Sequence, residues 1–148
     1  MNHPTTHHPQ LQTLLATHAH VLRPLLGHLW PVTPFKVQQF GPLTKYTLGQ
    51  MPDGTWAMLH HVTQPDVGAP HSHPCRFHSY RIKGSYWERL FVKGRTQDVL
   101  REEGSNHVIE PNCIHSLTSL PEGDCWTLCF SGPVVRRWRH YPKLLAAA

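Results

Sequence analysis

The sequence has few acidic residues and few charges altogether. Asp and Glu number 9 against 14 Lys and Arg, and charged residues make up 16% of the 148. The resulting formal charge of +5 is modest and scattered, and its one local cluster consists of Arg136, Arg137 and Arg139 beside Trp138. Nucleic-acid-binding proteins more often carry a basic stripe interleaved with aromatic residues. We therefore interpret the cluster as a solvated C-terminal strand and expect no nucleic-acid partner. A further reading is that one of these arginines points into the interior of the domain and pairs with a substrate carboxylate.

Long apolar runs and closely paired cysteines are also missing. No run approaches the roughly 20 apolar residues that a membrane-spanning helix needs, and the start of the chain has no apolar signal-peptide core. The four cysteines, Cys75, Cys113, Cys125 and Cys129, form no Cys-x-x-Cys pair. We expect reduced thiols, a cytoplasmic location and no membrane partner.

The length and composition favour one compact, strand-rich domain. A chain of 148 residues is long enough for one core and short for two. The 14 prolines and 10 glycines are spread along it, which is typical of many short strands and turns. Residues 1–10, rich in His, Pro and Thr, are expected to form a flexible tail, and residues 11–148 a single domain.

A leucine pattern near the N-terminus predicts a helical segment over residues 11–30. Apolar residues recur there at intervals of three and four, from Leu11 to Leu29. Pro24 is unfavourable in a helix interior, so we expect the helix to end near Leu22 or to restart at Pro24.

Beyond Trp30 the pattern changes to short β-like runs separated by turn signals such as Met51-Pro52-Asp53-Gly54. Nine or ten short strands at this spacing predict an all-β sandwich or barrel. The β-like runs that supply these strands are 35–40, 45–48, 56–62, 71–73, 77–83, 86–92, 99–101, 108–109, 114–120, 126–130 and 134–141.

Two histidines in this region have the spacing of a metal site. His71 and His73 are two residues apart, so on a β-strand both imidazoles project from one face and can reach one ion. His115, in a polar stretch after Gly104 and Pro111, is a third candidate. On the run 56–62, His60 and His61 lie on opposite faces, so one of them could face a barrel interior, although a solvent-facing or hydrogen-bonded core histidine is the more common case.

These residues resemble the two sequence motifs of the cupin superfamily. The first motif is matched by Gly68, His71, His73 and Gly84, but its glutamate is replaced by Phe77 or His78; the second is matched loosely by Gly104, Pro111 and His115. A group of small bacterial cupin-like proteins is more similar still, through the blocks His71-Ser72-His73-Pro74, Gly84-Ser85-Tyr86-Trp87-Glu88, His115, Trp126-Thr127-Leu128, Gly132-Pro133 and Arg137-Trp138. This resemblance implies a cupin jelly-roll barrel preceded by the short N-terminal helical segment.

The resemblance also implies a divalent metal held by His71, His73 and His115. Glu88 is the candidate for the missing carboxylate ligand, and His78 is its rival for the fourth position. Three ligand sets therefore stay open: three histidines with Glu88, three histidines alone, or two histidines with one carboxylate. We expect iron ahead of nickel, manganese, copper or zinc.

Candidate substrate contacts lie around the histidines. Tyr80, Tyr86 and Trp126 are candidates for an aromatic wall, and Arg76, Arg81 and Arg89 for a contact with a carboxylate. We take Tyr86, which shares a strand face with Glu88, and Arg76 as the candidate catalytic residues. Cys113 is placed near His115, either as a thiol close to the metal or as a packing residue.

The leading hypothesis is a metal-dependent cupin enzyme, a non-haem oxygenase acting on a small carboxylate or amino-acid-like molecule. The alternatives are a non-catalytic ligand-binding or sensor cupin, favoured by the incomplete motifs, and a metal-dependent isomerase or hydrolase. The expected partner is a small-molecule substrate, and a homodimer is compatible with the leucine-rich N-terminal segment.

Overall fold

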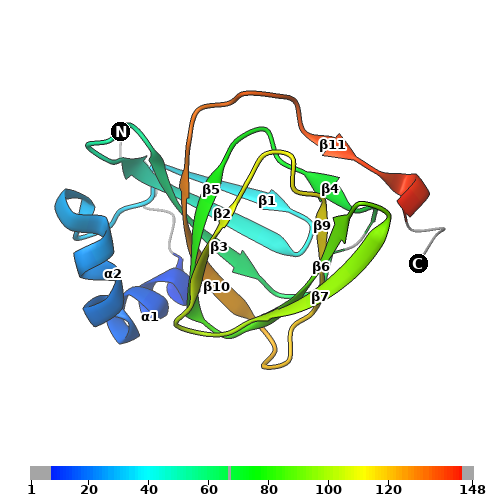
Figure 1. Cartoon of the computed structure of the whole chain (residues 1–148). Coiled ribbons are helices and arrows are strands. Elements are labelled where there is room, and N and C mark those ends of the chain that lie inside the picture. Colours follow the sequence, from blue (N-terminus) through cyan, green and yellow to red (C-terminus); the bar gives the residue numbers. More distant parts are fainter. Residues whose placement is uncertain (1–7, 67, 145–148) are drawn as a thin grey trace. The chain divides into compact units, whose positions relative to one another are not determined.

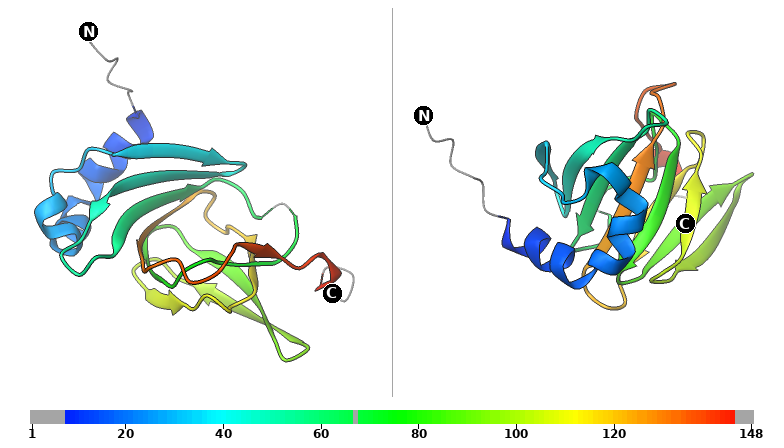
Figure 2. Two further views of the ribbon diagram at one scale, coloured as in Figure 1. Left: turned by 90° about the horizontal axis from the view of Figure 1, so that it is seen from above. Right: turned by 90° about the vertical axis from the view of Figure 1, so that its left-hand side faces the viewer.

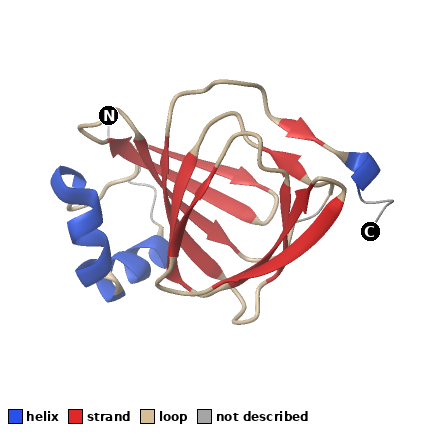
Figure 3. Cartoon of the chain, in the orientation of Figure 1, coloured by secondary structure: helices blue, strands red, loops and turns tan. Residues whose placement is uncertain are grey.

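The computed structural model describes residues 8–66 and 68–144. The chain divides into two compact units, a helical unit up to Val32 and a β unit from Thr33 onward. Figure 3 shows that, apart from one short turn of helix near the C-terminus, the helices belong to the first unit and the strands to the second. No helix in the described part of the chain is long and apolar enough to cross a membrane.

The helical unit contains α1 (Pro9–Thr17), α2 (Ala19–Leu26) and the 3₁₀ turn η1 (Gly27–Leu29). Its buried apolar residues, among those that the structure describes, are Leu11, Leu14, Leu15, Leu22, Leu26 and Val32. The predicted helical segment is confirmed, but the predicted break at Pro24 is wrong, because α1 ends before His18 and Pro24 lies inside α2. A proline this close to the end of a two-turn helix removes only one backbone hydrogen bond, so α2 tolerates it.

The β unit consists of two antiparallel sheets. The six-stranded sheet has the order β1-β2-β3-β10-β5-β8 and the five-stranded sheet the order β11-β4-β9-β6-β7. Figures 1 and 2 show the two sheets curving around a shared interior. The strands are β1 (Lys36–Phe40), β2 (Leu43–Gln50), β3 (Trp56–Val62), β4 (His71–Ser72), β5 (Phe77–Lys83), β6 (Tyr86–Val92), β7 (Arg95–Arg101), β8 (Asn106–Ile109), β9 (His115–Ser119), β10 (Cys125–Ser131) and β11 (Arg139–His140), followed by the 3₁₀ turn η2 (Pro142–Leu144).

The predicted all-β architecture is confirmed, and the bounds predicted for β3, β5 and β6 coincide with those observed. The expected last strand over 134–141 is wrong in extent, since only Arg139–His140 pairs with a neighbouring strand. The backbone N–H groups of Val135 and Arg136 instead both donate to the carbonyl of Pro74, at 2.8 and 3.2 Å. This segment is therefore an irregular connection and not a strand.

Strand β10 is buried on both faces, which explains its uninterrupted apolar and small residues. On one face Trp126 stacks on His61, with ring centroids 4.0 Å apart. On the other face Thr127 and Cys129 lie beside Arg81 and Ser79 of β5 in the strand register. The Arg81 side chain reaches Tyr86 of the opposite sheet, so this second face forms the interior between the sheets, and that interior is polar.

Candidate metal centre

Three histidines converge on adjacent strands of the five-stranded sheet. His71 begins β4, His115 begins β9, and the two residues are direct cross-strand partners. Side chains of such partners on one face lie close together, which brings two distant sequence positions into contact. His73 lies one residue beyond the end of β4, and its side chain nevertheless reaches the same point.

The ring nitrogens of His71, His73 and His115 form a compact group. One nitrogen from each lies within 4.8 Å of the others, and the Nε2 atoms of His73 and His115 are 2.8 Å apart. The structure thus brings together the three histidines that were predicted as ligands. Three imidazoles that approach from one side leave the remaining positions around an ion open.

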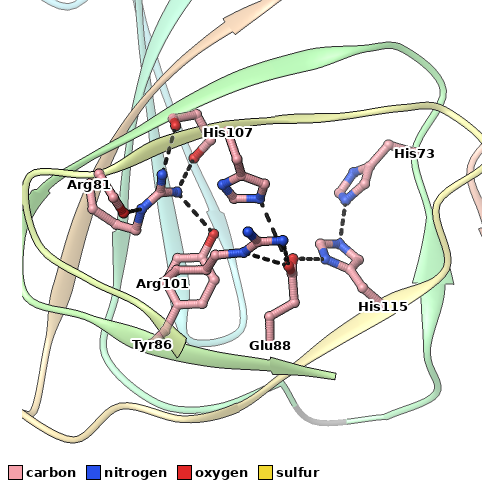
Figure 4. Close-up of polar contacts among 9 residues, drawn as sticks. His73, Arg81, Tyr86, Glu88, Arg101, His107 and His115 are labelled. Carbon is pink, nitrogen blue, oxygen red and sulfur yellow. Dashed lines mark hydrogen bonds and ion pairs between the residues drawn. The ribbon is translucent and has the colours of Figure 1, made fainter. Parts of the chain in front are cut away.

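Glu88 lies behind His115 and is not in the three-histidine group. Its Oε2 accepts a hydrogen bond from His115 Nδ1 at 2.6 Å, and its Oε1 accepts from Nε and Nη2 of Arg101 at 3.0 and 2.8 Å. Figure 4 shows this chain from Arg101 through Glu88 and His115 to His73. Both carboxylate oxygens are already engaged, so the structure places the predicted fourth ligand as a support for His115.

The charge state of Glu88 follows from these contacts. Burial of the side chain, which is 1% exposed, raises the pKa of the carboxyl, but the hydrogen bonds and charges of His115 and Arg101 outweigh burial and bring the pKa to about 2. Glu88 is therefore ionised and can only accept hydrogen bonds. His115 Nδ1 must therefore donate to it, and this fixes the ring so that Nε2 points toward His73.

The other two histidines are held neutral. Burial, with the neighbouring His115 and His140, lowers the pKa of His71 to about 4, and burial with His115, His71 and His60 lowers that of His73 to about 2. His73 Nδ1 is also buried without a hydrogen-bond partner among the described residues. Neutral imidazoles whose ring nitrogens face one another are the donor set that a divalent transition metal requires, so these residues fit a metal ion.

Trp138 covers the three-histidine group from the C-terminal segment. Its ring stacks on His71 at 4.9 Å with an interplanar angle of 14°, and meets His73 edge-on at 4.8 Å. Strand β11 holds it there, because Arg139 pairs with Ser72 and His140 with His71. The sequence analysis predicts a solvated strand for this segment. The presence of Arg137-Trp138 among the cupin-like blocks is the feature of the sequence that could have indicated a place beside the histidines.

A second polar group lies deeper between the sheets. The Arg81 guanidinium, on a residue that is 1% exposed, donates from Nε to Ser105 Oγ, from Nη1 to Ser79 Oγ and Tyr86 Oη, and from Nη2 to the Ser79 carbonyl, at 3.0 to 3.4 Å. Tyr86, one of the predicted catalytic residues, is thus buried beside Arg81 on the strand that also carries Glu88, and burial raises the pKa of its hydroxyl.

Other predicted residues lie elsewhere. Arg76 is exposed and its Nε pairs with the carboxylate of Glu110 at 3.2 Å, so the structure does not bring it to the histidines. His78 Nε2 bonds to the side-chain oxygen of Asn106 at 2.9 Å and is not in the three-histidine group. Cys113 precedes β9 in a turn and is half-buried.

Sequence reasoning gave little weight to His60, which the structure places on the polar face of β3. Its Nδ1 lies 3.7 Å from the sulfur of Cys129, and its Nε2 is buried without a hydrogen-bond partner among the described residues. His60 also contributes to the low pKa of His73, so both rings share the interior. The alternation along the strand predicts that His60 and His61 lie on opposite faces. It does not indicate which of the two faces the interior between the sheets.

Several solved structures share this fold. Hydroxypropylphosphonic acid epoxidase from S. wedmorenis, in complex with fosfomycin, aligns with a TM-score of 0.55 and 12% identity over 68% of this chain, which spans only 57% of that protein. Oxalate decarboxylase of Lactobacillus farciminis, in a formate complex, aligns with a TM-score of 0.56 and 15% identity over 76% of this chain and 35% of its own. The polyketide cyclase RemF from Streptomyces resistomycificus aligns with a TM-score of 0.54 and 25% identity over 76% of this chain and 82% of its own.

All three are cupin-fold proteins, and this chain has the same jelly-roll architecture, with a three-histidine group between its sheets. No protein-family model and no curated protein matches the sequence. The chain therefore has the cupin fold, and its histidine motif resembles that of the cupin superfamily.

Proposed function

We propose that the protein is a metal-dependent cupin enzyme, a non-haem oxygenase that acts on a small carboxylate or amino-acid-like substrate. The observation that carries the proposal is the convergence of His71, His73 and His115, with ring nitrogens within 4.8 Å and two neutral rings. Iron is the proposed metal; His71, His73 and His115 would hold it, and it would supply redox chemistry with dioxygen. A solved structure of the epoxidase HppE with Fe(II) is among the similar folds and supports this choice.

The surrounding residues would orient the metal ligands and the substrate. Glu88 and Arg101 fix the ring of His115, so its Nε2 keeps one direction without adjustment during the reaction. Arg76, Arg81 and Arg89 are the candidates near the histidines for a contact with a substrate carboxylate. Of these, Arg89 pairs with Asp98 and Arg76 with Glu110. Arg81 remains, and it replaces Arg76 as our proposed substrate contact.

The environment of Arg81 supports this role. Every oxygen atom that its side chain contacts is neutral, and the residue is 1% exposed. A buried charge without a counter-ion is costly, and a substrate carboxylate in the interior would compensate it. Tyr86, whose hydroxyl accepts from Arg81, would help to position the same carboxylate.

Oxygen uptake tests the reaction class. The protein is stripped of metal, reconstituted anaerobically with Fe(II), and mixed with small carboxylates, amino acids and thiols in an oxygen electrode. We expect at least one of these classes to cause uptake that requires iron and is lost in His73→Ala. Uptake that is equal in wild type and variant, or none with any class, contradicts an oxygenase.

A second candidate is a metal-dependent cyclase or isomerase in which the ion acts as a Lewis acid without dioxygen. The likeness to the polyketide cyclase RemF, at 25% identity over most of both chains, favours it. Substrate turnover in the absence of oxygen, supported by zinc or manganese as well as by iron, would select this candidate over the oxygenase.

A further inference from the structure

The β unit has a cavity of about 470 Å³ whose lining does not include His71, His73 or His115. Residues of β6, β7 and β8 and of the turn before β9 line it, and β7 and β8 are edge strands of the two sheets. The cavity therefore lies where the two sheets are not joined by strand pairing. Its volume is in the range of small-molecule sites, about 300–1,000 Å³.

The lining of the cavity includes a histidine whose ring nitrogens have no hydrogen-bond partner among the described residues. This residue is His107, and both of its ring nitrogens are buried. The closest acid is Glu88, whose Oε1 lies 3.8 Å from His107 Nε2, too far for a hydrogen bond. Buried polar atoms are almost always satisfied in proteins, and a ligand is one way to satisfy them.

Arg101 lies beside His107 and has N–H groups that donate to no described residue. Glu88 takes Nε and one hydrogen of Nη2, and no described residue accepts from Nη1. Arginine carries five N–H donors in a planar fork that matches a carboxylate. The second carboxylate of the lining, Glu110, is paired with Arg76, whereas Lys93 at the rim makes no ion pair among the described residues. Lys93 is therefore the one charged residue of the lining without an ion pair among the described residues, and its charge is positive.

The walls of the cavity are apolar. Leu90 and Phe91 come from β6, Ile109 from β8 and Ile114 from the segment before β9. These side chains would contact a hydrocarbon body while the polar residues of the lining receive a polar head group. Such a combination of apolar walls and a few convergent polar groups is typical of a ligand site.

We propose that this cavity binds a small organic acid with an apolar body, whose carboxylate is received by Arg101 and His107. The three histidines of the metal centre are not in its lining, and Glu88 separates the two sites, since one of its oxygens holds Arg101 and the other holds His115. The cavity is thus a ligand site on the far side of His115 from the metal position. It does not depend on the proposed oxygenase activity.

Cys113 provides a reporter for occupancy. It lines the cavity and is half-buried, whereas Cys75, Cys125 and Cys129 are buried. The metal-free protein is treated with a small maleimide, with and without phenylacetate, cyclohexanecarboxylate or hexanoate. The acids are used at up to about 10 mM, because molecules of this size bind weakly. Phenylacetamide, the neutral analogue of the first acid, is tested beside them.

We expect the acids to slow the labelling of Cys113 and to raise the melting temperature. The amide should bind at least about tenfold more weakly, because it loses a hydrogen bond to a charged group. In His107→Leu, protection by the acids should weaken by a similar factor. His28→Leu, at an exposed turn in the helical unit, is the matched control and should behave as wild type.

The outcomes separate this site from the metal centre. Replacement of the unpartnered His107 by leucine removes buried polar atoms, so the variant should fold and melt no lower than wild type. The proposal is overturned if none of the acids protects Cys113, if the amide protects equally well, or if His107→Leu leaves protection unchanged. His71→Ala/His73→Ala should retain acid binding, so failure of the metal assignment would not affect this result.

Discussion

At the scale of single residues, the carboxylate of Glu88 connects the metal position to the rest of the interior. It is ionised in a buried position because Arg101 and His115 both donate to it. A carboxylate hydrogen-bonded to the second nitrogen of a ligand histidine fixes the tautomer and direction of that ring. Glu88, which was predicted as a ligand, thus contacts and orients His115, another of the predicted ligands.

Glu88→Gln should weaken metal binding by about tenfold or more, because outer-sphere partners of ligand histidines typically contribute 10- to 100-fold to affinity. The measurement is a competition titration of Co(II) against a chromophoric chelator. Asp98→Asn removes an exposed carboxylate that pairs with Arg89 and is the matched control. Equal affinities of Glu88→Gln and wild type would show that Glu88 does not support His115.

The stability of the metal-free protein should fall as the solution is acidified from pH 7. In the folded protein the pKa values of His71 and His73 are about 4 and 2, below the ordinary 6.5. Below pH 6.5 the unfolded chain therefore binds more protons at these two residues than the folded chain does. The free energy of unfolding then decreases by up to about 1.4 kcal/mol per pH unit for each histidine. Glu88, at about 2 instead of 4.5, continues the loss below pH 4.5.

Melting temperatures at pH 7, 6, 5 and 4 measure this dependence. The difference between pH 7 and pH 5 should shrink in His71→Ala/His73→Ala, which lacks the two depressed groups. A wild-type stability that rises on acidification over this range would contradict the neutral, buried state of the two rings.

At the scale of elements, a glycine sets the turn between β5 and β6. Gly84 has a φ of 78°, and a Cβ built there would lie 2.5 Å from the carbonyl oxygen of Asp124. Its N–H donates to Glu103 at 2.9 Å. The turn thus joins the two sheets where the chain before β10 passes close by.

Gly84→Ala should destabilise the protein by about 3 kcal/mol, since it combines left-handed strain with a backbone clash. Gly94→Ala, in the turn between β6 and β7, is a close control because its φ is 75° and a Cβ there meets nothing within 4 Å. Strain alone should make it cost about 1 kcal/mol. Chemical denaturation of both variants measures the difference, and equal values would show that Gly84 has room for a side chain.

The C-terminal segment around β11 is the other element that shapes the site. Trp138 is 48% exposed, yet its ring stacks on His71. Trp138→Ala should speed the loss of bound Co(II) to excess chelator by about tenfold, as for other outer-sphere partners of metal ligands. Trp56→Ala, at 39% exposure on β3, is the control and should release the ion as wild type does. Equal release rates in the two variants would exclude a role for the stack.

The sequence predicted the strands better than the contacts between them. Strand-favouring residues and turn signals located β3, β5 and β6 to the residue, because β3 follows the Asp53-Gly54 turn, Gly84 separates β5 from β6, and β6 ends at the Lys93-Gly94 turn. His71 and His73 could be found from spacing alone. The Glu88–Arg101 pair could not, since it depends on the register that places β7 beside β6, and register depends on tertiary structure.

At the scale of the whole molecule, the interior of the β unit explains why the chain retains so many buried polar residues. Arg81, Glu88, His115 and Ser79 are all at most 3% exposed. Polar interiors are costly to fold, and they are retained where a site requires them. The cupin jelly roll provides two sheets whose facing surfaces can carry such groups.

The central claim is that His71, His73 and His115 hold one metal ion, and metal analysis of the untagged protein tests it most directly. After purification and equilibration with Fe(II) or Co(II), wild type should contain about one ion per chain, and His71→Ala/His73→Ala should contain almost none. His18→Ala/His20→Ala removes another His-x-His pair, on the helical unit, and should keep the wild-type content. Metal retained in His71→Ala/His73→Ala at the wild-type level would contradict the account.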